Sequence, residues 1–242
     1  MGEPEAVVTV AAELRMFLRA GRRDDPVRVA CDGVSSLLHV VESLGVPRTE
    51  VGSLTVNGST ESPSYLPRGG DVVRVLAVPR PQRRDSARFL LDVHLGALAR
   101  RLRVIGVDAA YDNEAADDDL VRQANAERRV LLTQDRRLLC RRQLWAGAYV
   151  RGAHPDDQLG DVLDRFVPPL APWTRCTACN GQIRPVAKTA VEPLLEPGTR
   201  RTYHEFAQCQ ACGRVYWRGA HARRLQAIVD GSLAVAGRAA PG

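Results

Sequence analysis

"VLLTQDRRLLCRR", residues 130–142, decides the fold class of the middle of this chain. An apolar run of strand length ends at Thr133, and Asp135 and a basic stretch follow it at once. The same pattern occurs earlier, because "RFLLDV" (88–93) is a second short apolar run that ends in an acid, Asp92. Helical stretches lie between and after these runs. Such alternation predicts an α/β fold with a parallel sheet flanked by helices.

Shifts in composition divide the 242 residues into four segments. Residues 1–78 hold Val-rich strands, one amphipathic helix and an Asn57-Gly58 hairpin turn, in the order of a β-grasp domain. Residues 79–87, rich in Pro and Arg, are expected to be a linker. Residues 88–167 carry the alternating strands and helices. Residues 168–242 carry paired cysteines and a C-terminal tail, so we predict three domains.

Composition and charge narrow the class of protein. The hydrophobic fraction of 45% is ordinary for a globular chain, and no run approaches the ~18 apolar residues of a membrane span. The N-terminus lacks the pattern of a signal peptide, so we expect a cytoplasmic protein. The net charge of +6 lies after residue 87, with 11 Arg against 9 acids in residues 88–150 and 12 Lys+Arg against 8 acids in residues 151–242. That bias fits a polyanionic partner, and equally a merely soluble surface.

Acids follow the predicted strands where a parallel sheet binds its ligands. Asp92 and Asp135 come after two strands, and Asp117 and Asp119 open a helix that should start at the same edge. Carboxylates that converge repel one another, and a bound Mg²⁺ or Mn²⁺ ion usually compensates their negative charge. The alternative is helix capping, which by itself is the better account of Asp117 and Asp135. Asp92 has no obvious capping pattern, and Asp119 fits either role.

Basic residues lie close to these acids in the sequence. They would hold a phosphate backbone beside the acidic site. The candidates are Arg100, Arg101, Arg136, Arg137 and Arg141.

The cysteine pairs are the strongest single signal. "CTAC" (176–179) and "CQAC" (209–212) are separated by 29 residues, and turn residues follow each pair. This spacing predicts a tetrahedral site of four thiolates for a structural Zn²⁺, formed by Cys176, Cys179, Cys209 and Cys212. Downstream, Trp217 and His221 lie among arginines, which suits single-stranded RNA, although packing within the domain explains them equally well.

Several of these stretches together resemble the Mut7-C ribonuclease family. They are "FLLDVHLGALARRLRVIGVDAAY", "DDDLVRQANAERRVLLTQDRRLL" and "RCTACNGQI…FAQCQACGRVYWRGAHARRL". The resemblance implies a PIN-like nuclease fold joined to a C-terminal zinc ribbon, and hence a metal-dependent ribonuclease acting on RNA. It matches Asp92, Asp117, Asp119 and Asp135 to the acids of that pattern and Thr133 to a supporting hydroxyl. Asp156 is the best candidate for a fourth acid.

The first segment resembles ubiquitin-like sulfur carriers, through "VNG" and "LPRGGDVVRVL". It departs from them because Gly69-Gly70 precedes the last strand instead of ending the chain, so these glycines are interpreted as a turn. We therefore expect a docking domain for a protein partner instead of a sulfur donor. Two functions stay open: a metal-dependent ribonuclease, and a non-catalytic RNA-binding or adaptor protein that acts through its ubiquitin-like and zinc modules.

Overall fold

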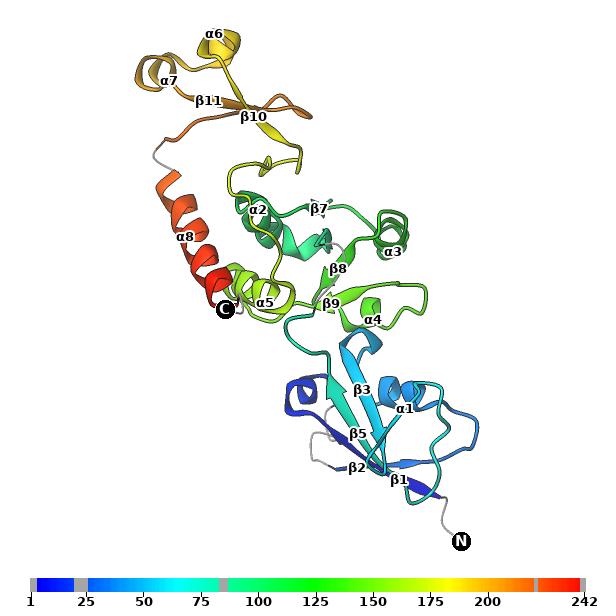
Figure 1. Ribbon diagram of the computed structural model, residues 1–242. Helices are drawn as coiled ribbons and strands as arrows, with labels where there is room; N and C mark the ends of the chain where they lie inside the picture. The colour runs from blue at the N-terminus through cyan, green and yellow to red at the C-terminus, as the bar shows by residue number, and fades with distance from the viewer. Residues whose placement is uncertain (1–3, 20–25, 83–86, 220–221, 240–242) are drawn as a thin grey trace. The chain divides into compact units, whose positions relative to one another are not determined.

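The computed structural model describes residues 4–19, 26–82, 87–219 and 222–239. The chain divides into two compact units, and Figure 1 labels their helices and strands. The first unit consists of residues 1–82 together with residues 133–149, and the second consists of residues 83–132 together with residues 150–242. In the described part of the chain, no helix has the length and apolar composition that crossing a bilayer requires.

The first unit is built on a five-stranded sheet with the order β2-β1-β5-β3-β4. β1 and β5 run parallel, and the other neighbours are antiparallel. The strands are β1 (Glu5–Val10), β2 (Val27–Ala30), β3 (Val51–Val56), β4 (Ser59–Glu61) and β5 (Val72–Ala77). Two 3-10 turns, η1 (Ala12–Phe17) and η2 (Arg48–Glu50), lie between them. This is the predicted β-grasp topology.

A single helix, α1 (Leu37–Ser43), packs its apolar face on this sheet. Ser36 caps the helix by accepting a hydrogen bond from the His39 N–H. Alternating strand residues such as Val8 and Val73 meet the helix in a core from which water is excluded. Each apolar side chain buried in this way contributes about 1.5–3 kcal/mol, an upper estimate because the unfolded chain is itself partly compact.

The Gly69-Gly70 pair forms a tight turn before β5, as the sequence predicts. Gly70 has a φ of +91°, a conformation that residues with a side chain rarely adopt. Asp71 fixes the turn, because its carboxylate accepts hydrogen bonds from the Arg68 N–H at 2.8 Å and from the Tyr65 hydroxyl at 3.0 Å. These glycines are therefore internal to the domain.

Two elements from the middle of the sequence complete the first unit: α4 (Arg136–Leu139) and β9 (Gly147–Tyr149). The Tyr149 ring packs edge-on against Phe17, with centroids 5.0 Å apart. The Tyr149 N–H donates to Glu50 Oε1 at 2.8 Å, and Glu50 is buried. Arg136 donates to the Met16 carbonyl at 2.7 Å and to the Phe17 carbonyl at 3.2 Å. The ubiquitin-like domain and this segment thus share one core.

The second unit contains three parallel strands in the order β7-β6-β8. They are β6 (Phe89–Leu91), β7 (Ala109–Tyr111) and β8 (Val130–Thr133), of which Thr133 falls in the first unit. Helices accompany them: η3 (Val93–Leu95), α2 (Gly96–Val104), α3 (Asp117–Ala126) and α5 (Pro155–Phe166). α2 ends at Val104, two residues before Gly106. A Cβ there would lie 1.9 Å from the Ala171 carbonyl oxygen, and the φ of Gly106 is +84°. The parallel sheet with helices confirms the predicted fold class.

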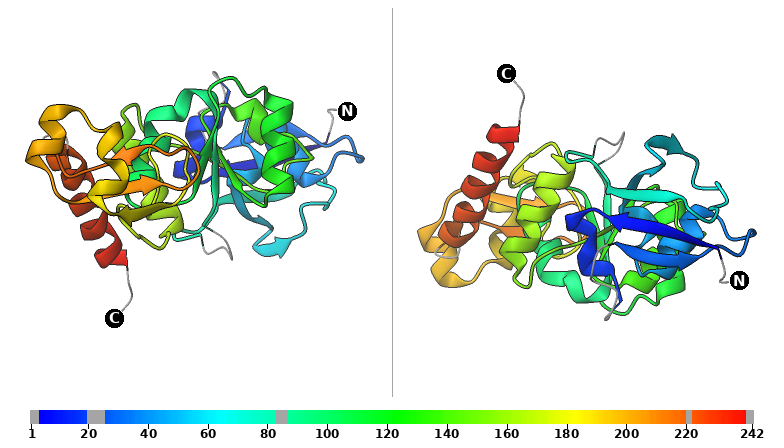
Figure 2. Two further views of the ribbon diagram at one scale, coloured as in Figure 1. Left: turned by 90° about the horizontal axis from the view of Figure 1, so that it is seen from above. Right: turned by 90° about the horizontal axis from the view of Figure 1, so that it is seen from below.

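The C-terminal part of the second unit is an antiparallel sheet with the order β10-β11-β12. Its strands are β10 (Ile183–Val186), β11 (Phe206–Cys209) and β12 (Val215–Tyr216). α6 (Lys188–Val191), η4 (Glu192–Leu194) and α7 (Pro197–Thr202) connect the first two strands. The chain then returns in α8 (Ala222–Ala239), which packs on α5 and α2 and is the red helix of Figure 2. This helix was not predicted from the sequence.

Candidate functional site

Asp92 is a carboxylate buried at the end of an apolar strand. Phe89, Leu90 and Leu91 of β6 are fully buried, and Asp92 itself is only 5% exposed. Its N–H donates to the Leu132 carbonyl at 3.0 Å, so sheet pairing with β8 continues up to this residue.

Both carboxylate oxygens of Asp92 have close neighbours. Oδ1 accepts a hydrogen bond from the Val93 N–H at 2.7 Å, and Oδ2 lies 3.4 Å from His94 Nδ1. Asp92 thereby caps η3. The expectation that Asp92 has no capping role was wrong, because the chain turns into a short 3-10 helix straight after the strand.

The acids of α3 differ from Asp92 because solvent surrounds them. Asp117, Asp118 and Asp119 occupy the first turn of the helix, where its dipole favours negative charge, and all three are exposed. The N-cap residue is Ala116, and it makes no side-chain capping bond, so the expected cap at Asp117 was wrong. Asp119 forms an ion pair with Arg122 one turn on, at 2.7 Å.

Thr133 and Asp135 belong to the first unit. Thr133 is buried, and its Oγ1 accepts a hydrogen bond from the Asp135 N–H at 2.8 Å. Asp135 caps α4, because its Oδ1 accepts from the Arg137 N–H at 2.7 Å. The capping role predicted for Asp135 is confirmed, and the threonine hydroxyl fixes the backbone that presents the carboxylate.

The predicted acids are thus distributed over two units. Asp92, Asp117 and Asp119 lie in the second, and Asp135 lies in the first. Among the described residues, one group of three or more Cys, His, Asp or Glu side chains brings its ligand atoms within 4.8 Å of one another, and it is the four cysteines. A shared ion for Asp92, Asp117 and Asp119 therefore remains a prediction from the sequence.

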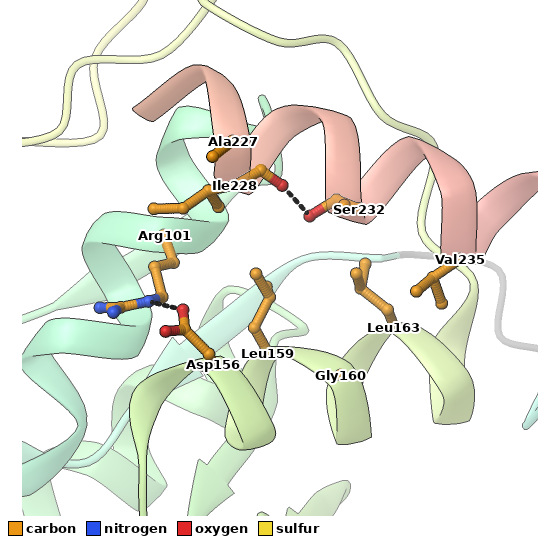
Figure 3. Close-up of a pocket in the computed structure, with 10 residues that line it drawn as sticks. Arg101, Asp156, Leu159, Gly160, Leu163, Ala227, Ile228, Ser232 and Val235 are labelled. Carbon is orange, nitrogen blue, oxygen red and sulfur yellow. Dashed lines mark hydrogen bonds and ion pairs between the residues drawn. The ribbon is translucent and has the colours of Figure 1, made fainter. Parts of the chain in front are cut away.

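Some of the predicted basic residues have partners within their own unit. Arg101 Nε lies 2.7 Å from Asp156 Oδ1 (Figure 3). Asp156, the candidate fourth acid, is therefore paired with an arginine that was predicted to bind RNA. This pair borders a mainly apolar cavity of about 360 Å³ between α5 and α8. Arg136 holds the carbonyls of η1 and lies over the Phe17 ring. Arg100 and Arg137 are exposed, and Arg141 is half-buried.

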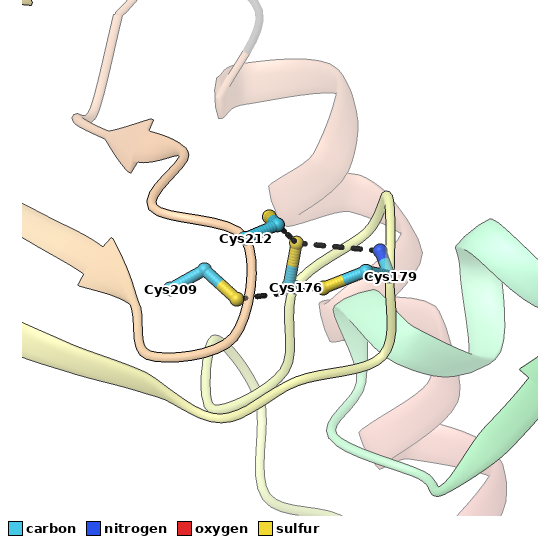
Figure 4. Close-up of side chains that lie close together, drawn as sticks. All are labelled: Cys176, Cys179, Cys209 and Cys212. Carbon is cyan, nitrogen blue, oxygen red and sulfur yellow. Dashed lines mark hydrogen bonds between the residues drawn. The ribbon is translucent and has the colours of Figure 1, made fainter.

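The four cysteines lie together at two turns, as the spacing predicts (Figure 4). Cys176 Sγ is 3.7 Å from Cys212 Sγ, and Cys179 Sγ is 3.5 Å from Cys209 Sγ. Sulfur atoms of a tetrahedral zinc site lie about 3.8 Å apart, given a Zn–S bond of about 2.3 Å. Asn180 and Gly213 follow the pairs with φ values of 67° and 72°, which closes each knuckle. The cluster therefore fits zinc.

Hydrogen bonds favour the thiolate form of Cys176. Burial alone would raise the pKa of this thiol, but bonds from the Tyr216 hydroxyl and from the N–H groups of Cys179 and Ala178 lower the pKa to about 6. The Tyr216 hydroxyl lies 2.9 Å from Cys176 Sγ. Tyr216 is thus a support of the cysteine cluster. His221 lies outside the described residues.

Asp108 is a half-buried acid between α2 and β7 that binds several side chains from distant parts of the chain. Its carboxylate pairs with Arg129, with Arg175 at 3.2 Å and with Arg88 at 3.5 Å. It also accepts a hydrogen bond from Asn180 Nδ2 at 2.8 Å. These partners come from distant parts of the chain, so no local pattern could have revealed them.

Comparison with known proteins agrees with the resemblance seen in the sequence. The family model described as Mut7-C RNAse domain matches residues 87–229, and the one described as Mut7-C ubiquitin matches residues 3–85. Neither the curated proteins nor the solved structures contain a match to the chain. The first match covers more than half of the sequence and includes Asp92, the acids of α3 and the four cysteines. The chain therefore belongs to the Mut7-C RNAse domain family and carries the Mut7-C ubiquitin domain at its N-terminus.

Proposed function

We propose that this protein is a metal-dependent ribonuclease that hydrolyses phosphodiester bonds of RNA. The match to the Mut7-C RNAse domain supports the nuclease. Within it, the observation that carries the proposal is the buried carboxylate of Asp92 at the end of β6. Burial of a charged carboxylate costs free energy. A functional site that needs the negative charge is one explanation for a buried carboxylate.

Asp92 is the centre of the proposed cation site. Asp117 and Asp119 supply further oxygen ligands from α3, and oxygen donors are what Mg²⁺ and Mn²⁺ prefer. When bound, such an ion would supply an activated water and neutralise charge at the phosphate. Asp135, whose backbone N–H is held by Thr133, is a further predicted ligand on the basis of the sequence pattern.

The chain's own residues would orient the substrate. Arg100 and Arg137 are exposed and suited to phosphate groups of RNA, whereas Arg101 and Arg136 first serve the structure of their units. His94, 3.4 Å from Asp92, would hold that carboxylate in place. Zinc at the four cysteines would be structural, because four thiolates leave no open position for a substrate.

An RNA cleavage assay with Asp92→Asn protein tests the proposal. A mixed pool of structured and single-stranded RNAs is incubated with Mn²⁺, Mg²⁺ or EDTA. The matched control is Asp118→Asn, which removes an exposed acid from the same unit. We expect cleavage that needs the divalent ion, that Asp118→Asn retains and that Asp92→Asn loses by at least about a hundredfold, as when a metal ligand is removed. Unchanged cleavage by a folded Asp92→Asn protein would contradict the proposal.

A non-catalytic adaptor is the second candidate function. The capping bonds of Asp92 and Asp135 favour it, because these bonds give the acids a structural role. In that case the ubiquitin-like domain would dock a protein partner and the ribbon would bind RNA. Thermal melting against Mn²⁺ concentration separates the two. A cation site of repelling acids should raise the melting temperature in wild type but not in Asp92→Asn, whereas an adaptor should respond in neither.

A further inference from the structure

The ribbon, which is the antiparallel sheet β10-β11-β12 with the helices that connect its strands, contributes to a cavity of about 880 Å³ with several aromatic rings in its lining. The sequence has four Phe, three Trp and five Tyr residues, and five of these twelve line this one cavity. They are Trp173, Tyr203, Phe206, Tyr216 and Trp217. A domain that needed them only for a core would bury them, but Trp217 is 42% exposed. An exposed indole at a cavity is a surface for a flat ligand.

Two of these rings, Tyr203 and Trp217, lie next to each other in the lining. The centroids of Tyr203 and Trp217 lie 6.4 Å apart, with their planes inclined by 42°. A flat ring stacked between two others needs about 7–8 Å and nearly parallel planes, so a base could enter between these two only if the pair opened and turned toward parallel. Gly219 lets the chain pass close to the indole, because a Cβ there would lie 2.9 Å from Trp217 Nε1. This close approach of the backbone restricts the position of the Trp217 ring.

Polar groups at the cavity suit the remaining parts of a nucleotide. Arg218 is exposed beside Trp217 and offers a cation for a phosphate group. His204 and Glu205 are also exposed at the lining and offer hydrogen-bonding groups to the edge of a base. Arg175 also lines the cavity, but its guanidinium forms an ion pair with Asp108. Residues 151–242 carry 12 basic and 8 acidic side chains, a bias that suits an anionic ligand such as RNA.

We propose that this cavity binds an unpaired base of single-stranded RNA, which stacks on Trp217 while Arg218 holds a neighbouring phosphate. The inference rests on the proposed function, because it names the form of RNA that the protein receives. A base within a duplex presents its faces to its neighbours and is not available for stacking on an indole. Selection of RNA by the ribbon would therefore favour unpaired segments.

Tryptophan fluorescence can test this in full-length protein that does not cut its ligand. In the double variant Asp92→Asn, Trp145→Ala, the remaining tryptophans are Trp173 and Trp217, and both line the cavity. We expect a single-stranded oligoadenylate of about ten nucleotides to quench this fluorescence. The same oligonucleotide annealed to its complement should not quench it at equal concentration. Equal quenching by the duplex would overturn the inference.

Affinity measured by anisotropy of a labelled oligonucleotide gives the second test. In the Asp92→Asn background, Trp217→Ala should weaken binding of the single strand about 5- to 100-fold, and Trp217→Phe should restore most of it. Trp145→Ala is the matched control, because Trp145 is 39% exposed and lies in the other unit. Arg218→Glu, which leaves the rings in place, should also weaken binding. Unchanged affinity in folded Trp217→Ala and Arg218→Glu proteins would overturn the inference.

These outcomes can be separated from those of the cleavage assay. If wild-type protein does not cut RNA but Trp217→Ala loses single-strand binding, the cavity is supported and the ribonuclease proposal fails. If wild-type protein cuts RNA but folded Trp217→Ala binds the strand as before, the ribonuclease stands and the cavity inference fails. Zinc content, equal in all variants, confirms that the ribbon is folded.

Discussion

Asp108 holds together three parts of the second unit. Its carboxylate faces the buried Arg129 guanidinium, the Arg175 side chain at the start of the ribbon and the Asn180 amide of the first knuckle. Burial raises the pKa of this carboxyl, but the hydrogen bonds from Arg129 and Asn180 outweigh burial and keep the pKa below its ordinary value. A single side chain thus links the strand region to the cysteine cluster.

Asp108→Asn should lower the free energy of unfolding by about 2–4 kcal/mol, because it leaves the buried guanidinium of Arg129 with less compensating charge. Denaturation by urea, monitored by circular dichroism, measures the change. Asp112→Asn, at an exposed position four residues on, is the control and should have little effect. Equal stability of the two variants would show that the Asp108 network is energetically neutral.

The same residue predicts how stability depends on pH. The pKa of Asp108 is lower in the folded state than in the unfolded state, and hydrogen bonds from Arg129 and Gln123 likewise lower the pKa of Glu127. Their stabilisation is therefore complete above the ordinary carboxyl values of about 4 and is lost as the pH falls below them. Melting temperatures between pH 6 and pH 3 should fall more steeply for wild type than for Asp108→Asn. Parallel curves would contradict this assignment.

At the scale of elements, the first cysteine knuckle is docked onto the edge of the sheet. Arg103, which is buried in α2, donates to the carbonyls of Thr177 and Ala178 and to the carbonyl of Ala109 in β7. The Asn180 side chain accepts a hydrogen bond from the Ala109 N–H at 3.1 Å. The conformation of the knuckle is therefore coupled to β7.

Removal of zinc by a chelator should consequently loosen β7 as well as the ribbon. We expect faster amide exchange in residues 107–111, measured by mass spectrometry, and a lower melting temperature. Asn180→Gly is an informative comparison, because glycine tolerates the positive φ of this position while the amide is lost. That variant should keep its zinc and still exchange faster in β7. Unchanged exchange in both proteins would show that the ribbon and the strand are independent.

The sequence predicted the elements whose signal is local. Apolar runs predicted β6 and β8, alternating residues predicted β5, and Cys-x₂-Cys pairs predicted the cysteine cluster. β7 was missed because "AAY" carries little apolar signal, and α8 was missed because its Ala- and Gly-rich sequence has no clear boundary. Asp108 was missed for a different reason: its role arises from partners far away in the chain. Contacts between residues far apart in the chain are the feature that is hardest to predict from a single sequence.

At the scale of the whole molecule, the borders of the compact units differ from those of the family matches. The Mut7-C RNAse match runs from residue 87 to residue 229, yet residues 133–149 pack with the ubiquitin-like domain. Glu50, Tyr149 and Phe17 form the contact, and Arg136 ties α4 to the backbone of η1. The ubiquitin-like domain therefore supports the segment that carries Asp135.

Arg136 and Arg137 allow this contact to be tested with adjacent residues. Arg136→Ala removes two hydrogen bonds from a charged donor and should destabilise the first unit by about 1–2 kcal/mol. Arg137→Ala, at an exposed neighbour, should leave stability unchanged and weaken RNA binding modestly. Proteolysis of the native proteins, followed by peptide mapping of residues 133–149, reports the difference. Equal protection of that segment in both variants would argue against the contact.

The discontinuity of the first unit has a consequence for the way the protein is made. The first 82 residues leave the ribosome early, but their unit is complete only when residues 133–149 have followed. While residues 83–132 emerge, the apolar site on Phe17 that Tyr149 covers in the folded protein is still uncovered. A nascent chain that stalls in this interval would expose that apolar site to chaperones. Pausing of translation between these two points would therefore prolong the exposure of that site.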